Sequence, residues 1–444
     1  MKQVSNWGNT PTINASLIPF HQLEQLKEVI HHIPTLIPRG MGRCYGDSAL
    51  SDTILSTTDF NQIISFDVST GILICQSGMT LDAILNTIVP AGWFLPVTPG
   101  TKFVSIGGAV AANVHGKNHH VHGSLSQHLQ YIDVLTSDGT IIRCSPDEQS
   151  DLFYMTCGGM GLTGIIVEVA ITLIPISSSY IRQKTMRANN LDTIMDYFES
   201  HHHWTYSVAW IDCLAKGSSL GRSVLMLGEH ATRDELSHRQ SKNPLQLSSK
   251  RKKNIPFFLP NWALNSWTVR LFNMAYFHAS PQSEAIKTTD YDTFFYPLDH
   301  IHHWNKCYGK RGFTQYQCVF PLHSSKDGLT QLLHKISDSG QGSFLAVLKR
   351  FGTESLPGLS FPMEGYTLAL DFPMTPKTCQ LMNELDTIVE HYNGRLYLAK
   401  DSRMSASFFK STYKNVDAFI SHKKNIDTRH QFQSMQSCRL SMNA

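Results

Sequence analysis

The sequence has no C-x-x-C pair, although it contains nine cysteines scattered along the chain. This odd, unpaired set argues against a disulfide framework and paired-cysteine zinc sites, and it is typical of a reducing compartment. The N-terminal residues lack the basic start and apolar stretch of a secretory signal, and no run approaches the roughly 20 apolar residues of a membrane span. We therefore expect a cytoplasmic protein.

Charge is also scarce in this chain. Charged residues make up 16% of the 444 residues, and the formal net charge is +3. That balance is too small to indicate an electrostatic nucleic-acid binder. The 41% of hydrophobic residues excludes a disordered chain. At about 100 to 200 residues per domain, the length predicts two or three domains.

A Rossmann fingerprint is missing as well. The string Gly159-Met160-Gly161-Leu162-Thr163-Gly164 has the G-x-G-x-x-G spacing. That fingerprint needs a strand before it, a helix after it and an acidic residue about 20 positions further on. Here a predicted helix precedes the string, a strand-like run follows it, and position 184 is Lys184. We therefore exclude a Rossmann domain.

The first part of the chain contains short β-branched runs bounded by Gly, Asp or Ser, which predict strands. They cover residues 53–55, 71–75, 131–136, 140–143 and 164–174. Apolar residues at helical intervals after a polar Thr80 predict a helix at 80–88, and acidic residues in the first turn predict one at 147–155. After Pro175, the sequence predicts helices at 191–202 and 326–337, and strands at 206–212, 223–227 and between 313 and 372. The fold class is therefore α+β, and we expect the second part to be an antiparallel sheet with helices on one face.

Three glycine-containing segments lie in the strand-rich part: Arg39-Gly40-Met41-Gly42-Arg43, Pro99-Gly100 with Ser105-Ile106-Gly107-Gly108, and residues 158–164. We expect each to place backbone without a Cβ in a loop, where N–H groups can turn toward phosphate oxygens. One such segment alone is ordinary turn chemistry. Three of them in one half of the chain favour a bound diphosphate.

Further strings follow these segments in a fixed order. They are Trp7-Gly8, residues 39–47, His115-Gly116-Lys117-Asn118-His119-His120, residues 312–317, Lys349, and Tyr397 with Ala399-Lys400-Asp401-Ser402-Arg403. The set resembles FAD-binding oxidoreductases of the PCMH or vanillyl-alcohol oxidase type, and among them the decaprenylphosphoryl-β-D-ribose 2'-oxidases. The resemblance implies a two-subdomain FAD-binding domain at 1–178 and a substrate-binding domain at 179–394. It also implies that residues 395–444 return to the FAD-binding domain.

The resemblance implies which residues contact FAD. They are Arg39, Gly40, Met41, Gly42, Arg43, Cys44, Tyr45, Gly46, Asp47, Ser48, Ala49, Gly100, Ser105, Ile106, Gly107, Gly108, Ala112, Asn113, Val114, His115, Ile166 and Tyr397. Covalent members of the family attach the flavin through a histidine at the position that Arg43 occupies here. The resemblance therefore implies noncovalent FAD.

Oxidation of an alcohol sends a hydride to the flavin and a proton to a base. By resemblance, catalysis falls to Lys400, His115 and Tyr45, and substrate binding to Gln315, Gln317, Lys349, Thr367 and Ala369. Thr367 and Ala369 stand at positions that resemble an asparagine and a cysteine in the best-known members of the family. A lysine can act as a base at neutral pH only if burial or a neighbouring cation lowers its pKa.

Each of these assignments has an alternative. Lys400 could form a structural ion pair with Asp401, and Lys349 could extend its amine into water from a strand end. The two glutamines could lie on a solvent-facing sheet surface, and His115 could be an ordinary loop histidine. A buried Lys349 would need an anionic partner, which a substrate phosphate would provide.

The histidines near His115 invite a metal-site interpretation. They are His119, His120, His122 and His128. Gly116 and Gly123 argue against a helix that would align them, and no H-E-x-x-H string accompanies them. We therefore predict no metal site.

The sequence thus predicts an FAD-dependent oxidoreductase that converts the 2'-hydroxyl of a polyprenylphosphoryl pentose to a ketone, the first half of a ribose-to-arabinose epimerisation. A short-chain dehydrogenase/reductase would act on the keto product. The lipid favours a peripheral contact with the inner face of the membrane through Lys250 to Lys253 and residues 255–259, unless that run is a solvated loop. Two other functions stay open: an FAD-dependent oxidase of a soluble sugar, alditol or aldonolactone, and a flavin-binding scaffold without turnover.

Overall fold

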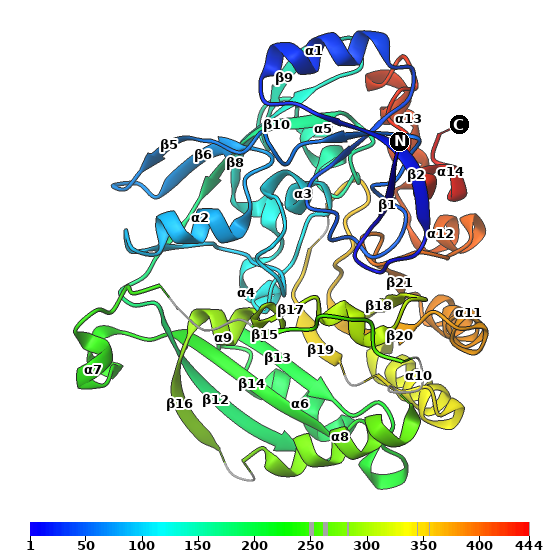
Figure 1. The fold of residues 1–444 in the computed structure, drawn as a ribbon. Helices are drawn as coiled ribbons and strands as arrows, with labels where there is room; N and C mark the ends of the chain where they lie inside the picture. The colour runs from blue at the N-terminus through cyan, green and yellow to red at the C-terminus, as the bar shows by residue number, and fades with distance from the viewer. Residues whose placement is uncertain (248–252, 261–264, 282–283, 344, 355, 444) are drawn as a thin grey trace.

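The computed structural model describes residues 1–444 except 248–252, 261–264, 282–283, 344, 355 and 444, and Figure 1 shows two lobes. The upper lobe contains a four-stranded sheet in the order β1 (Lys2–Ser5), β2 (Thr12–Pro19), β4 (Thr53–Ser56) and β3 (Ile37–Arg39). It also contains a five-stranded sheet in the order β5 (Ile63–Asp67), β6 (Ile72–Gln76), β10 (Ile165–Thr172), β8 (Leu129–Leu135) and β9 (Ile141–Cys144). The strands predicted before Pro175 are confirmed.

The helices of the upper lobe are short. They are α1 (Leu23–His32), α2 (Leu81–Ile88), α3 (Ile106–Ala111), α4 (His119–His122) and α5 (Ser150–Thr156). The predicted helix at 80–88 is confirmed, because the Thr80 side chain caps α2 by accepting the Ala83 N–H. The helix predicted at 147–155 begins only at Ser150, because Gln149 has a left-handed backbone with φ of 50°.

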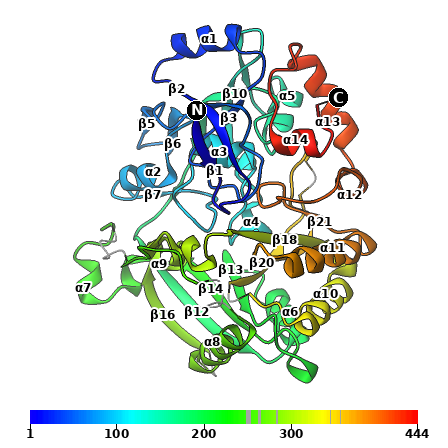
Figure 2. The same ribbon diagram turned by 45° about the vertical axis from the view of Figure 1, so that its right-hand side comes forward.

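The C-terminal part of the chain lies beside the upper lobe, as Figures 1 and 2 both show. It contains α12 (Ala406–Thr412), α13 (Val416–Ile426) and α14 (Met435–Arg439). The Leu36 N–H donates to the Gln431 carbonyl at 2.9 Å, and the Arg439 guanidinium pairs with Asp47 at 2.8 Å. Residues far apart in sequence therefore build this lobe together.

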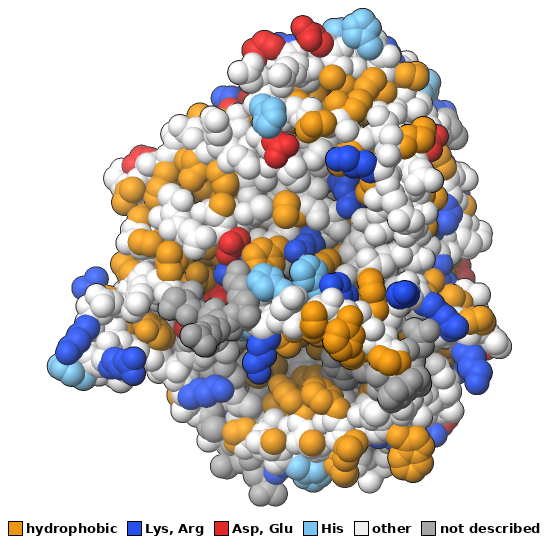
Figure 3. Space-filling view, in the orientation of Figure 1, with side chains coloured by type: hydrophobic (Ala, Val, Ile, Leu, Met, Phe, Trp, Pro, Cys, Tyr) orange, Lys and Arg blue, Asp and Glu red, His pale blue; other side chains and the backbone are white. Residues whose placement is uncertain are grey.

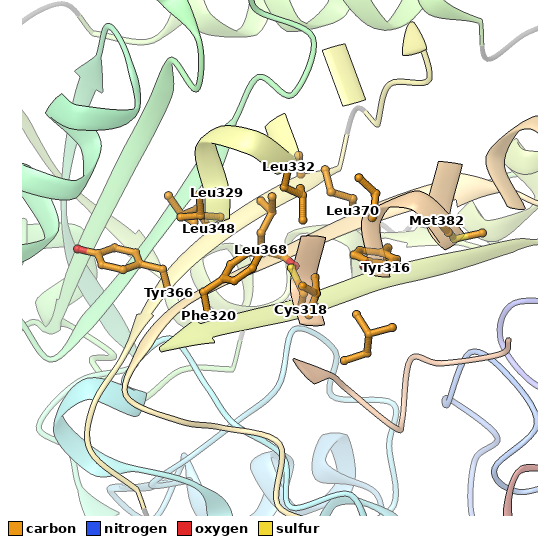
Figure 4. Close-up of a cluster of buried hydrophobic side chains, with 14 of the residues drawn as sticks. Tyr316, Cys318, Phe320, Leu329, Leu332, Leu348, Tyr366, Leu368, Leu370 and Met382 are labelled. Carbon is orange, nitrogen blue, oxygen red and sulfur yellow. The ribbon is translucent and has the colours of Figure 1, made fainter. Parts of the chain in front are cut away.

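The lower lobe is built on an eight-stranded antiparallel sheet. Its order is β16 (Ala285–Asp290), β12 (Tyr180–Ala188), β14 (Ser223–His230), β13 (Tyr206–Ile211), β19 (Ala346–Phe351), β20 (Gly365–Pro373), β18 (Phe313–Pro321) and β21 (Arg395–Leu396). One face packs on α6 (Leu191–Ser200), α10 (Ser325–Ser339) and α11 (Pro376–His391). Figure 4 shows the centre of this core, where Tyr316, Cys318 and Phe320 of β18 meet Leu329 and Leu332 of α10.

Helix α8 (Ser266–Ala279) corrects the expectation that helices cover only one face of this sheet. Strand alternation places Ala209 in the large core and its neighbour Trp210 on the other face. Phe277 of α8 packs against Trp210 and Val224 there, because an aromatic ring on that face needs cover. No helix within the described ranges is long and apolar enough to span a bilayer.

The remaining elements are small. They are β7 (Trp93–Phe94), β11 (Ile174–Pro175), β15 (Lys253–Asn254), β17 (Ile301–His302), α7 (His238–Ser241) and α9 (Tyr291–Phe295), together with short 3₁₀ turns such as those at Leu125–His128 and Trp304–Tyr308.

Candidate active site

The five predicted substrate residues lie on one face of the lower sheet. Gln317 in β18 stands opposite Ala369 in β20, and Lys349 in β19 stands opposite Thr367. Because side chains alternate along a strand, Gln315 shares the face of Gln317. The residues between them point into the hydrophobic core on the opposite face (Figure 4). The predicted parity of the two glutamines is therefore confirmed.

His115 reaches this face from the upper lobe. Its Nε2 lies 3.0 Å from the Gln317 side-chain nitrogen, so the amide donates and the imidazole accepts. Burial, with the nearby Lys349 charge, holds the pKa of His115 well below its usual range. A neutral ring that accepts at Nε2 carries its proton on Nδ1. Nδ1 is buried without a hydrogen-bond partner among the described residues, so it is available to a ligand.

Lys400 lies against Tyr45. Its Nζ is 4.0 Å from the centroid of the Tyr45 ring, and the Tyr45 N–H donates to the Ala399 carbonyl at 3.0 Å. Asp401 instead pairs with Arg439 at 2.7 Å, so the alternative of a structural Lys400–Asp401 ion pair is wrong. Burial lowers the pKa of Lys400 to about 8, although the charge of Asp371 opposes this. Lys400 thus meets the condition for a base near neutral pH.

Tyr45 itself is not a base in this environment. Burial raises the pKa of its hydroxyl well above the usual value, and the charge of Asp371 adds to this effect. The ring is edge-on to Phe313, with centroids 5.2 Å apart. The Tyr45 hydroxyl therefore stays protonated, and the face of its ring lies against the Lys400 amine.

Lys349 lies in the middle of β19, not at a strand end. No carboxylate within the described part of the chain is at ion-pair distance from it, and its side chain keeps partial solvent contact. Burial lowers the pKa of Lys349 to about 7, and the charge of Lys400 adds to this. Two lysines that act on each other's charge favour the binding of an anionic ligand near them.

Sequence reasoning missed Asp371. This residue stands opposite Gln315 in the β18–β20 pairing, and its Oδ1 accepts the Gln315 side-chain N–H at 2.7 Å. Burial raises the pKa of Asp371 to about 7. The run from Leu368 to Pro373 carries no motif, but Asp371 has the same strand parity as Thr367 and Ala369. That parity was the available signal.

The three glycine segments meet around α3. The Gly158 N–H donates to the Val110 carbonyl at 3.1 Å, and a Cβ at Gly40 would collide with the Ser105 side chain. The expectation of a loop at Gly107 and Gly108 is wrong, however. Both lie in the first turn of α3, because the Ser105 hydroxyl accepts the Gly108 N–H at 3.3 Å.

The residues predicted to contact FAD differ in their solvent exposure and fall into three groups. Buried are Tyr45, Gly46, Asp47, Ser48, Ser105, Ile106, Gly107, Asn113, Val114, His115, Ile166 and Tyr397, half-buried are Arg39, Gly40, Gly42, Arg43, Cys44, Ala49 and Ala112, and exposed are Met41, Gly100 and Gly108.

Several of these residues fit a flavin dinucleotide. Gly42 has φ of 60°, which favours glycine, and a Cβ at Gly100 would meet nothing within 4 Å. Ser48 Oγ and His115 Nδ1 are buried without hydrogen-bond partners among the described residues. The Tyr397 hydroxyl donates to the Ala112 carbonyl at 2.8 Å, which ties the C-terminal segment to the same region.

The neighbouring histidines are already engaged. Contrary to expectation, residues 119–122 form the one-turn helix α4, which Gly123 closes with φ of 62°. His119 Nε2 lies 3.1 Å from Glu354 Oε2, and His120 Nε2 lies 2.8 Å from the Trp204 carbonyl. No group of three or more His, Cys, Asp or Glu suited to a metal occurs in the described part of the chain. The string at 159–164 follows α5 and precedes β10, as predicted.

Comparison with known proteins agrees with this geometry. The model of an FAD binding domain family matches residues 21–145. The chain is 33% identical to decaprenylphosphoryl-beta-D-ribose oxidase of Mycolicibacterium smegmatis over 451 residues, covering 99% of this chain and 98% of that protein. Mitochondrial D-2-hydroxyglutarate dehydrogenase of Bos taurus is 33% identical over 29% of this chain and 25% of its own length. The structure of Physcomitrella patens BBE-like 1 superposes with a TM-score of 0.63 at 14% identity, covering 93% of this chain and 88% of that one.

Proposed function

Because the chain belongs to the PCMH-type FAD-binding oxidoreductases, among the relatives of decaprenylphosphoryl-beta-D-ribose oxidase, we propose that it oxidises the 2'-hydroxyl of a polyprenylphosphoryl pentose. The chain is an FAD-dependent oxidoreductase that acts on a hydroxyl group. The observation that carries the finer proposal is the pair Lys349 and Lys400. The charges of both amines act on His115, whose Nε2 lies 3.0 Å from the Gln317 amide, and this combination suits a ligand with both a phosphate and sugar hydroxyls.

In this proposal each side chain has a defined task. The flavin supplies the acceptor for the hydride that leaves C2' of the sugar. Neutral Lys400 takes the hydroxyl proton, and Tyr45 supports the resulting ammonium. His115 offers its Nδ1–H, while Lys349 binds the phosphate. Gln315 and Gln317, with Thr367 and Ala369 beside them, orient the sugar.

We also propose a division of the chain into the FAD-binding residues 1–178, the substrate-binding residues 179–394 and the returning residues 395–444. The packing of α12 to α14 against the upper lobe supports it (Figure 2). β21 still pairs with β18 in the lower sheet, so the return follows directly after this strand. Arg43 has no nucleophile to offer the flavin, which supports noncovalent FAD; release of all flavin on denaturation would test this.

The proposed product is a 2'-keto sugar on a lipid phosphate. A short-chain dehydrogenase/reductase that reduces this ketone from the opposite face would complete an epimerisation. A lipid-linked substrate also requires a peripheral contact with a membrane. Of the residues considered for it, Lys250, Arg251 and Lys252 lie outside the described residues, while Phe257 is 64% exposed.

Helix α8 supports this contact. Trp267 is 83% exposed and Leu271 is 64% exposed, and these residues are one helical turn apart. Figure 3 shows a hollow in the lower lobe with hydrophobic side chains inside it and Lys or Arg side chains near its rim. A cavity of about 280 Å³ lies between Ser266 and Val269 of α8 on one side and Asp371 on the other. A prenyl chain could therefore run from a bilayer to the sugar site.

The position of oxidation is tested by trapping the product. The protein is incubated with a short-chain prenylphosphoryl ribose and an artificial electron acceptor, and sodium borodeuteride then reduces the ketone. Deuterium at C2', in both ribose and arabinose, is the expected result. Deuterium at another carbon would contradict the 2' assignment, and label incorporation only with a soluble alditol or aldonolactone would favour the soluble-substrate alternative.

A further inference from the structure

The substrate-facing side of the lower sheet carries a carboxylate, Asp371, beside the residues assigned to catalysis. Its side chain is 1% exposed. Oδ1 accepts the Gln315 amide N–H at 2.7 Å, whereas Oδ2 is buried without a hydrogen-bond partner among the described residues. The backbone N–H of Asp371 donates to Ser343 Oγ at 3.0 Å, so the strand holds the carboxylate firmly in place.

A buried carboxylate with one unsatisfied oxygen is costly. Two other buried carboxylates pair directly with an arginine: Asp401 lies 2.7 Å from Arg439 and Asp386 lies 2.6 Å from Arg403. Asp371 has no such arginine partner among the described residues. The cation whose charge acts on it is Lys400, the proposed base.

Several elements contribute charged or titratable groups around this pair. Facing Lys400 and Asp371 are Lys349 from β19, Cys44 and Tyr45 from the loop after β3, Tyr308 from a 3₁₀ turn, and His115 from the loop before α4. Asp371 is the only carboxylate in this set of described residues. It is therefore the group that can compensate a positive charge formed on Lys400.

We propose that Asp371 is a positioning residue of the oxidation, whose carboxylate stabilises the ammonium formed on Lys400 and whose Oδ1 aims the Gln315 amide at the sugar. This inference rests on the proposed function, because it assumes that Lys400 takes the alcohol proton. In that step the C2'–H electron pair goes to the flavin, the O–H proton goes to Lys400 Nζ, and the C=O bond forms. The flavin is the oxidant, so no further reactant is needed.

The sign of the electrostatic effect follows from the two groups. Burial lowers the pKa of Lys400 to about 8, while the Asp371 charge raises it. Since the neutral amine is the base, the rate of flavin reduction rises with pH through this value. Removal of the Asp371 charge lowers the pKa of Lys400 further, so this limb of the pH profile moves to lower pH.

The test is Asp371→Asn in the FAD-loaded protein, because asparagine keeps an oxygen for Gln315 but has no charge. In stopped-flow measurements of flavin reduction by prenylphosphoryl ribose, the rising limb of the pH profile should move to lower pH by about one unit. The plateau rate at high pH should fall roughly tenfold. Lys410→Met on the exposed surface of α12 is the control: it keeps the Asp371 carboxylate and the Gln315 hydrogen bond, so the limb and the plateau rate should both match the wild type. Asp371→Ser carries the same test if the asparagine variant does not hold flavin.

A second measurement does not depend on turnover. Brief treatment with acetic anhydride across a pH series labels neutral amines, and peptide mass spectrometry reports Lys400, with exposed Lys27 as internal reference. The labelling midpoint of Lys400 should move to lower pH in Asp371→Asn. Identical midpoints and identical limbs in both proteins would overturn the inference. If the substrate fails to reduce the wild type, the proposed function fails, while the labelling still decides whether Asp371 acts on Lys400.

Discussion

Lys400 and Lys349 give the site its chemical character. Burial brings the pKa of Lys400 to about 8 and that of Lys349 to about 7. A phosphate bound at Lys349 would keep that amine protonated. Lys349 is thereby suited to hold a phosphate, whereas Lys400, over the Tyr45 ring, is suited to receive a proton.

Replacement of Lys400 tests this division of roles. Lys400→Met keeps the length of the side chain but removes the amine, so flavin reduction by the alcohol should slow by about a hundredfold or more. The absorbance spectrum of the oxidised flavin should persist. Rapid-mixing absorbance measures the rate, and Lys410→Met on the exposed surface of α12 is the control. A reduction rate within twofold of the wild type would exclude Lys400 as the base.

At the scale of elements, Arg439 of α14 links the loop after β3, which contains Asp47, to the turn that contains Asp401 and Lys400. Arg439 pairs with Asp47 at 2.8 Å and with Asp401 at 2.7 Å. The three residues come from distant parts of the sequence. Their network holds the loop after β3 and the turn after Tyr397 in one arrangement, so Tyr45 and Lys400 stay in contact.

Arg439→Met should therefore destabilise the protein markedly, because it leaves two buried carboxylates without their cation. The expected loss in the free energy of unfolding is about 3 kcal/mol or more, measured by urea denaturation with the flavin bound. Lys335→Met, which breaks an exposed pair with Glu384, should cost less than about 1 kcal/mol. Equal losses in the two variants would contradict this account of α14.

Local patterns predicted the strands before Pro175 and the helices α2, α5, α6 and α10, but not helices such as α1, α3 and α8. The resemblance predicted which residues to examine. Thr80 predicted the start of α2 as its N-cap, and the two-residue spacing of Gln315 and Gln317 predicted that they share one face of a strand. Asp371 was missed because its meaning depends on pairing with Gln315, 56 residues away, which no local pattern encodes. α4 was missed because Gly123 was taken as a helix breaker, whereas here it ends a single turn.

At the scale of the whole molecule, the site is built from residues of both lobes (Figure 1), and a cavity lined by α8 and Asp371 adjoins it. The upper lobe contributes His115 and Tyr45, and the lower sheet contributes Lys349 and the glutamines. Ser266 and Val269 of α8 line this cavity, and Trp267 and Leu271 of the same helix are exposed. This layout suits a substrate with a polar head and a long apolar tail.

The membrane contact predicts a specific loss of function. Trp267→Glu with Leu271→Glu should reduce co-sedimentation with anionic phospholipid vesicles by about tenfold, and should slow turnover of a long-chain substrate in those vesicles. Turnover of a short-chain substrate without vesicles should not change. Ile64→Glu, at a 51% exposed position of the upper lobe, is the control. Undiminished vesicle binding by the double variant would contradict the role of α8.

The most direct test of the central claim is the flavin absorbance of the purified protein under anaerobic conditions, before and after addition of a short-chain prenylphosphoryl ribose. The account predicts a flavin spectrum beforehand and loss of the yellow band once the substrate is added, because hydride from C2' reduces the flavin. An unchanged band in the presence of this alcohol, with bleaching by a soluble sugar alcohol instead, would contradict the account.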